Sequence, residues 1–323
     1  MPKGNEFTVS LPLTTMALDR LKQYQGVMVG TDIFPEIPVA RPSGQFWNHG
    51  LEALLLQKTE RAPGAVGGMS NRTGAWVSYK TQQYAWGSPI TDEERIEAKD
   101  NPNIDLEVER TDDCLATIML AREARVSALL VASASYDAAN IKACPADARW
   151  DMHSGADHDI VRDVRTAIQA LLPLRADTII APARCQIASW GSPSLTEFLK
   201  YVEGPAYLNG GGLWGPKFMG LDVVTPDAVK LTSEPGATNA LGDVFVDDIQ
   251  IVCRGKKVGG KVVVGWGCSF IYPGPSNLVT ETWGGYSDTP ELTKFVRVRD
   301  KGRKEQILNT SAAYTLTSVL GEA

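Results

Sequence analysis

Histidine is scarce in this chain, and its cysteines form no metal-binding pattern. His153 and His158 lie five residues apart in a glycine-containing segment, a spacing that places them on no common helix face. We interpret this segment as a solvated loop and a metal site as the weaker alternative, so no metal ligands are predicted. The five cysteines are odd in number and include no CxxC pair. This usage predicts reduced thiols in a cytosolic setting and disfavours a disulfide framework or a zinc site.

Long apolar runs and basic runs are also missing. No apolar run approaches the roughly 20 residues that a membrane-spanning helix needs, and the N-terminal MPKGNEF lacks the apolar core of a signal peptide. The longest basic cluster, residues 301–304, is predicted to be a solvated turn. The net charge is −6, where a nucleic-acid binder usually presents a basic face. The 323 residues, 43% of them hydrophobic, suffice for one large or two smaller globular domains.

Common catalytic and cofactor-binding motifs do not occur. The run GKKVGGK at residues 255–261 is followed by Val262, whereas a phosphate-binding loop requires Ser or Thr there. The hydrolase motif GxSxG is absent. Cys114 and Cys268 are interpreted as small core residues. No catalytic residue and no cofactor are therefore predicted.

Residues 103–136 contain neither glycine nor proline. Their apolar residues recur at steps of three and four, which predicts an amphipathic helix about 50 Å long. Asn103 or Asp105 is expected to cap its start. Acidic residues crowd the first half, as the helix dipole favours.

The preceding region has a different character. Residues 1–30 are interpreted as an extended arm with a possible short helix at 13–24. Three prolines within residues 35–42 indicate an extended segment over 29–47 that is neither a helix nor a central strand. Residues 43–89 resemble a long two-stranded hairpin, with sides near 45–49 and 76–86 and a glycine-rich tip at 61–74. The apolar run 51–56 fits a helical turn equally well.

The second half alternates short helices and strands. Helices are predicted at 159–172, 182–189 and 194–201, and loops at 270–275 and 280–289. Strands are predicted at 178–181, 221–224, 244–246, 249–252, 262–266, 292–299 and 313–320. Helix, strand and helix in this order are typical of an α/β core.

Several segments in this order resemble the major capsid proteins of tailed bacteriophages, which have the Hong Kong 97-type fold. They include TDIFPEIPVARPSGQFW, RAPGA, YAWGSPITDEER, DNPNIDLE and LAREARVSALLVASASY, and the resemblance is tightest over residues 31–140. It implies an α+β fold with an N-terminal arm (1–43), an E-loop hairpin (44–90), a P domain (91–155 and 285–323) and an A domain (156–284). The helix at 103–136 would be the spine helix of the P domain, its apolar stripe facing 292–299 and 313–320. Its acidic half is expected to lie exposed near the base of the E-loop.

The resemblance also implies a function. Copies of the chain would self-assemble, as hexamers and pentamers, into an icosahedral virion shell that encloses double-stranded DNA without binding it specifically. Assembly would take place in the host cytoplasm, with scaffolding, portal and decoration proteins as possible partners and no membrane. The candidate residues for contacts between subunits are Arg61, Arg72, Trp76, Tyr79, Phe34 and Trp47. Some shells of this fold crosslink a lysine to an asparagine, but nothing in the sequence assigns Lys58, Lys80 or Asn309 to that role. An encapsulin-type compartment and a cytosolic α/β enzyme with a glycine-rich ligand loop are the alternatives.

Overall fold

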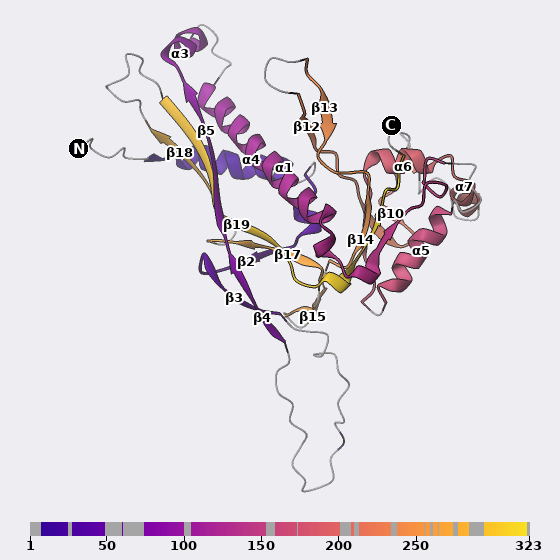
Figure 1. Ribbon diagram of the computed structural model, residues 1–323. Helices are drawn as coiled ribbons and strands as arrows, with labels where there is room; N and C mark the ends of the chain where they lie inside the picture. Colours follow the sequence, from indigo (N-terminus) through magenta and orange to yellow (C-terminus); the bar gives the residue numbers. More distant parts are fainter. Residues whose placement is uncertain are drawn as a thin grey trace.

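Two six-stranded sheets form the body of the protein, and a narrow hairpin extends from one end of it (Figure 1). The computed structural model describes residues 8–24, 28–48, 60, 74–99, 105–152, 159–172, 174–200, 208–209, 213–233, 238–254, 256–258, 261–263, 265–273, 277–283 and 294–321. Its helices are α1 (Leu11–Tyr24), α2 (Gly30–Ile33), α3 (Asp92–Lys99), α4 (Leu106–Val131), α5 (Ile160–Ala170), α6 (Ala183–Ser189) and α7 (Pro193–Lys200).

The strands are short, except for one. They are β1 (Thr8–Val9), β2 (Glu36–Pro38), β3 (Ser43–Asn48), β4 (Ala75–Lys80), β5 (Gln82–Ile90), β6 (Ile141–Ala143), β7 (Thr178–Ile180), β8 (Leu208–Asn209), β9 (Leu213–Trp214), β10 (Lys217–Phe218), β11 (Leu221–Val224), β12 (Val229–Leu231), β13 (Leu241–Asp243), β14 (Ile249–Val252), β15 (Lys256–Val258), β16 (Lys261–Val263), β17 (Gly267–Ile271), β18 (Leu278–Trp283), β19 (Lys294–Ile307) and β20 (Ala313–Thr317).

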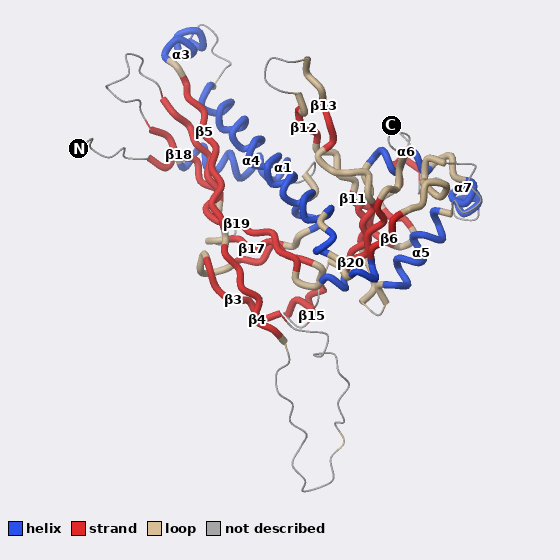
Figure 2. Tube along the Cα trace, viewed as in Figure 1, coloured by secondary structure: helices blue, strands red, loops and turns tan. Residues whose placement is uncertain are grey.

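Sheet 1 has the order β1-β18-β19-β17-β2, and β5 also pairs with β19. The 14-residue β19 joins these strands, because it pairs along its length with β5, β17 and β18 (Figure 2). Helices α1 and α4 cover one face, where Ala17, Leu115 and Val298 pack in one core cluster. The predicted N-terminal arm therefore includes a helix, α1, that lies against its own subunit.

Helix α4 confirms the predicted long helix but is shorter, at 26 residues. Asp105 caps its start by accepting hydrogen bonds from the amides of Glu107 (3.1 Å) and Val108 (3.4 Å). It ends at Val131, and the following turn is fixed by Tyr136, whose hydroxyl donates to the Leu130 carbonyl at 2.8 Å. The predicted continuation to residue 136 is therefore wrong, because this aromatic residue turns back onto the helix end.

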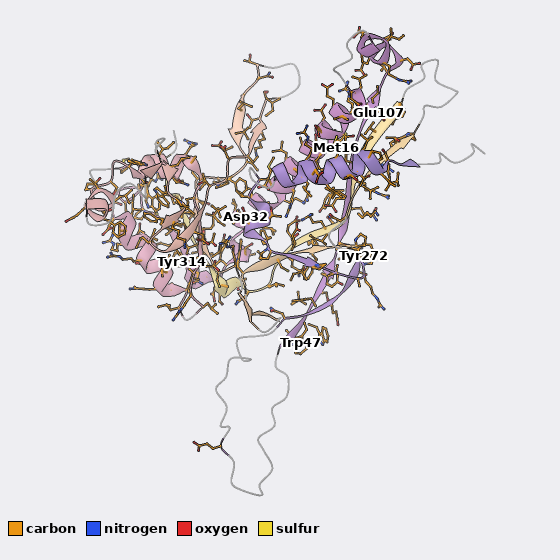
Figure 3. All side chains as sticks on the ribbon, turned by 180° about the vertical axis from the view of Figure 1, so that it is seen from behind. Met16, Asp32, Trp47, Glu107, Tyr272 and Tyr314 are labelled. Atoms are coloured by element: carbon orange, nitrogen blue, oxygen red, sulfur yellow. The ribbon has the colours of Figure 1, made fainter. Side chains whose placement is uncertain are left out.

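The apolar stripe of α4 shares core clusters with Val298 of β19 and with Ala313 of β20, the two segments that it was predicted to face. The position of its acidic half was predicted wrongly. Glu107 forms an ion pair with Lys294 at the start of β19. Lys294 lies opposite Ile90, the end of β5 that is farther from the β3–β4 hairpin. In Figure 3, Glu107 and Trp47 accordingly lie at opposite ends of the molecule.

Sheet 2 has the order β10-β11-β7-β14-β20-β6. Its β7, β11, β20 and β6 run parallel to one another, with β14 antiparallel between β7 and β20. Ile160 and Val164 of α5 pack with Ile179 of β7 in the core of this sheet. The predicted helices after residue 159 and the strand at 178–181 are confirmed, and Asp159 caps α5 by accepting from the Arg162 amide at 2.9 Å.

Strand membership corrects several sequence-based expectations. Residues 313–317 form β20 in the middle of sheet 2, not a strand beside 292–299. Strands β17 and β18 belong to sheet 1 and extend into the segments predicted to be loops, over 270–271 and 280–283. Residues 244–246 are not a strand, because Val244 and Phe245 fill a core cluster from an irregular segment. Gly30–Ile33 is a short helix within the segment predicted to be extended.

All five cysteines are buried thiols, as expected of a reduced protein. Among the described residues, no helix is both long enough and apolar enough to span a bilayer.

The buried thiols predict a loss of stability at alkaline pH. Burial, assisted by the nearby Asp163 carboxylate, raises the pKa of Cys144 from 9.0 to about 11. Between these values the folded protein keeps a proton that the unfolded chain releases, so the free energy of unfolding falls by about 1.4 kcal/mol per pH unit for this thiol. Urea unfolding between pH 8 and 11 should therefore show a shallower fall for Cys144→Ala than for the wild-type protein. An equal fall of the free energy of unfolding with pH in the two proteins would contradict the raised pKa of Cys144.

Candidate functional site

The feature that sets this chain apart from a compact globular protein is the β3–β4 hairpin. Its strands pair antiparallel from Ser43 opposite Lys80 to Asn48 opposite Ala75. In Figure 1 the hairpin leaves the body at the end opposite α3. Gly74 allows the chain to enter β4, since its φ is +152° and an added Cβ would lie only 2.5 Å from the carbonyl oxygen of Asn48.

Two tryptophans face each other across the hairpin. The rings of Trp47 and Trp76 meet edge to face with centroids 4.9 Å apart. Trp76 is nevertheless 60% exposed, an unusual position for the largest apolar side chain. A rigid aromatic pair on a projecting element is suited to contact another surface.

The root of the hairpin is packed onto sheet 1. Phe270 of β17 stacks on Tyr79 at 4.7 Å and meets Phe46 edge-on at 5.5 Å. Two further hydrogen bonds tie the hairpin to β19 and the residue after it. The side-chain amide of Gln306 donates to the Ser78 carbonyl (3.2 Å), and the side-chain amide of Asn48 donates to the Leu308 carbonyl (3.1 Å). These contacts give the hairpin a defined direction relative to the sheet.

A group of charged side chains, four of them buried, lies beneath this root. We call it the root cluster, and it consists of Glu36, Arg122, Arg125, Asp300, Arg303 and Glu305. Arg303 is its best-paired member, with Nε 3.0 Å from Asp300 and Nη1 2.8 Å from Glu36. A bulge in β19 between Asp300 and Arg303 allows two residues three positions apart to turn toward the same side.

Arg122 is less well paired than Arg303. Its Nη2 lies 3.6 Å from Glu36 and its Nε 3.7 Å from Glu305, and neither nitrogen has a hydrogen-bond partner, although the residue is 2% exposed. Burial, with the nearby Arg303, lowers the pKa of Arg122 to about 10. The neighbouring Glu123 has a raised pKa because it is buried, despite accepting a hydrogen bond from the Gly30 amide at 3.0 Å.

The structure separates the predicted contact residues into three groups. Arg61 and Arg72 lie outside the described residues. Trp47, Trp76 and Tyr79 come together on the hairpin, although Tyr79 turns its ring toward Phe270. Phe34 is corrected: it is fully buried and stacks on Trp266 at 5.2 Å, so it belongs to the core of its own subunit.

The root cluster was not predicted. Residues 301–304 were interpreted as a solvated turn, yet they lie within β19, and Arg303 is buried because Asp300 and Glu36 neutralise it. One signal was available: Arg122 follows Ile118 by four positions and precedes Val126 by four. It therefore falls on the apolar stripe of α4, where a buried arginine implies an acidic partner elsewhere.

The described part of the chain contains no cluster of three His, Cys, Asp or Glu side chains that could hold a metal ion. His153 and His158 lie outside it. An open cleft of about 760 Å³ lies beside the ends of β14 and β20, with Arg184, Asp247 and Asp248 in its wall. Its lining includes neither histidine nor cysteine, and Arg184 is paired with Asp247 at 3.0 Å. This wall offers no evident pair of nucleophile and base.

Comparison with solved structures shows which proteins share the fold of this chain. A phage-related protein from Bordetella bronchiseptica RB50 is 20% identical, with 98% of this chain and 99% of that chain covered and a TM-score of 0.67. The capsid of cyanophage P-SCSP1u is 12% identical over 88% of this chain and 86% of that chain, with a TM-score of 0.57. This chain has the fold of phage capsid proteins.

The capsid fold extends beyond phages. The SrpI encapsulin from Synechococcus elongatus PCC 7942 is 12% identical over 88% of this chain and 84% of that chain, with a TM-score of 0.51. No protein-family model and no curated protein matches the sequence. The structural similarity thus confirms the predicted α+β capsid fold. Sequence identities of 12% and 20% would carry little signal for this fold by themselves.

Proposed function

We propose that this chain is a structural shell subunit, the major capsid protein of a tailed phage or prophage. The observation that carries the proposal is the hairpin: it leaves the subunit on a rigid root and exposes Trp76 within a capsid fold. A lone two-stranded hairpin is marginal in water, so a projecting one is best explained by a neighbour that receives it. A head-to-tail contact of this kind generates closed rings when the rotation closes.

The proposed shell is an icosahedral head built from hexamers and pentamers around packaged double-stranded DNA. The net charge of −6 suits an enclosure that does not bind DNA specifically, because phosphate binding requires basic groups. Assembly would occur in the host cytoplasm and yield a virion component. Scaffolding, portal and decoration proteins are proposed partners on grounds of this role alone.

We further propose that sheet 1 with α4 forms the peripheral domain and that sheet 2 with α5, α6 and α7 forms the axial domain. This assignment follows the sheets, so it transfers β17 and β18 to the peripheral domain and β6 and β20 to the axial one. The β3–β4 hairpin then corresponds to the E-loop.

An encapsulin-type compartment is the second candidate, supported by the similarity to SrpI. The two differ in content: a compartment encloses a protein cargo, whereas a phage head encloses DNA. A cytosolic enzyme is disfavoured by the paired charges of the cleft wall and by the fold of the similar structures.

Expression of the chain alone, followed by size-exclusion chromatography and negative-stain microscopy, tests the proposal. Shell particles, or stable pentamers and hexamers, are the expected result. A protein that remains monomeric at high concentration and in the presence of a scaffold would contradict it. The nature of the content, nuclease-protected DNA or protein, then separates the two candidates.

Trp76 provides a more local prediction. Trp76→Ser should change the free energy of unfolding by about 1 kcal/mol or less, because only an aromatic edge contact is lost, yet it should impair particle formation. Trp86→Ser is the matched control, since Trp86 is 55% exposed on β5, outside the β3–β4 pair. Urea titration and particle counts measure the two effects. Equal loss of particles in both variants would refute a specific role for Trp76.

A further inference from the structure

Helix α4 contacts both the chain segment that enters the hairpin and the segment that leaves it. On the entering side, Glu36 of β2 lies seven residues before β3 and pairs with Arg122. On the leaving side, Tyr84 of β5 lies four residues after β4, and the Arg125 guanidinium covers its ring at 3.7 Å. Since Arg122 and Arg125 are three residues apart on one helix, the two holding points are about one helical turn apart.

The entering segment is the less firmly held of the two. Strand β2 is a three-residue edge strand, and its residues are exposed or half-buried. Pro35 and Pro38 cannot donate a hydrogen bond to the sheet. At the ends of β2, the Ser269 amide donates to the Pro35 carbonyl (3.0 Å) and the Val39 amide donates to the Ile271 carbonyl (2.9 Å). Phe34, two residues earlier, is fully buried, and the Glu36 carboxylate is the polar contact that holds the chain between this anchor and β3.

The root cluster can lose Glu36 without collapsing. Without it, two buried arginines, Arg122 and Arg303, still face two buried carboxylates, Asp300 and Glu305. Arg122 already lacks hydrogen-bond partners for Nε and Nη2. The cluster is therefore not fully hydrogen-bonded even with Glu36 present, whereas a network that serves stability alone would be.

We infer that Glu36 is a positioning residue: it fixes the direction of the hairpin relative to α4, and thereby the angle at which one subunit meets the next in the shell. Only the second part of this inference, the angle between subunits in the shell, rests on the proposed function. In a ring of head-to-tail contacts, a small change of this angle alters how the shell closes. Loss of Glu36 is expected to leave a folded subunit that builds particles of mixed diameter.

The test compares Glu36→Gln with Glu97→Gln, which removes an exposed carboxylate from α3. Hydrogen exchange of the isolated subunit should rise about tenfold in residues 36–48 of the Glu36 variant, the loss expected for a charged hydrogen bond. Exchange in α4 and the urea midpoint should match the control. Electron microscopy should show a broader distribution of particle diameters than the control gives.

Three outcomes would overturn the inference. Unchanged exchange in residues 36–48 would show that Glu36 does not hold the segment. A rise that extends through α4 with a lower urea midpoint would show a general structural role. Wild-type diameters despite raised local exchange would show that this segment does not set the angle. Failure of the wild-type chain to assemble would refute the proposed function instead, and the exchange experiment would still decide whether Glu36 holds the hairpin.

Discussion

Replacing Arg303 by methionine is expected to lower the free energy of unfolding by about 3–5 kcal/mol. The arginine bridges Asp300 at 3.0 Å and Glu36 at 2.8 Å, so its replacement leaves both carboxylates without this partner. Asp300 is 4% exposed, so its carboxylate would remain buried next to an apolar side chain. Breaking a buried pair from one side costs far more than the pair contributes, because the remaining charge cannot reach water. Urea titration followed by circular dichroism measures the difference.

Lys301→Met is the matched control for this experiment. Lys301 lies two residues away on the same strand, and its side chain is half-buried rather than buried. Removing its charge should change stability by about 0.5 kcal/mol or less. If Arg303→Met proves as mild as Lys301→Met, the root cluster does not stabilise the subunit in the way its geometry implies.

Replacing residues 49–74 by a two-residue Asn-Gly turn is expected to abolish particle formation while the subunit stays folded. Asn48 lies opposite Ala75, so an Asn-Gly turn can close β3 and β4 without altering their register. The cores of both sheets and the root contacts to Phe270 are untouched by the change. Size-exclusion chromatography and negative-stain microscopy give the assembly state.

The urea midpoint of the shortened protein is the necessary control, since an unfolded subunit would also fail to assemble. A wild-type midpoint with no particles is the expected combination. Normal particles from the shortened protein would mean that the removed segment makes no essential contact, and the hairpin could then no longer carry the proposed function.

Local patterns in the sequence were sufficient for the helices. The spacing of apolar residues located α4 and α5, and the cap Asp105 was identifiable because an N-cap acts on amides only two or three residues away. The two sides of the hairpin were also recognisable from their aromatic and β-branched residues, although the predicted second side ran on to residue 86, into β5 of sheet 1. Each of these features depends on neighbours within a few positions along the chain.

Pairing across long sequence distances was not predictable in the same way. Strand β20 lies in sheet 2 between β14 and β6, and its backbone partners there are 61 or more residues away, beyond the reach of a local pattern. Arg303 resembles a solvated cation until Glu36, 267 positions earlier, is placed beside it. Phe34 sits in a proline-rich extended segment, and only the position of Trp266 makes it a core residue.

The position of β19 and β20 in the two sheets has a consequence for protein synthesis. β19 joins β5, made some 200 residues earlier, to β17 and β18, and β20 is an interior strand of the second sheet. On a ribosome, sheet 1 cannot be completed until Ile307 has left the exit tunnel, and sheet 2 cannot be completed until Thr317 has. A nascent chain that already contains β3 and β4 therefore lacks the sheet on which the hairpin packs. Translation must be nearly complete before the chain can assemble with another copy.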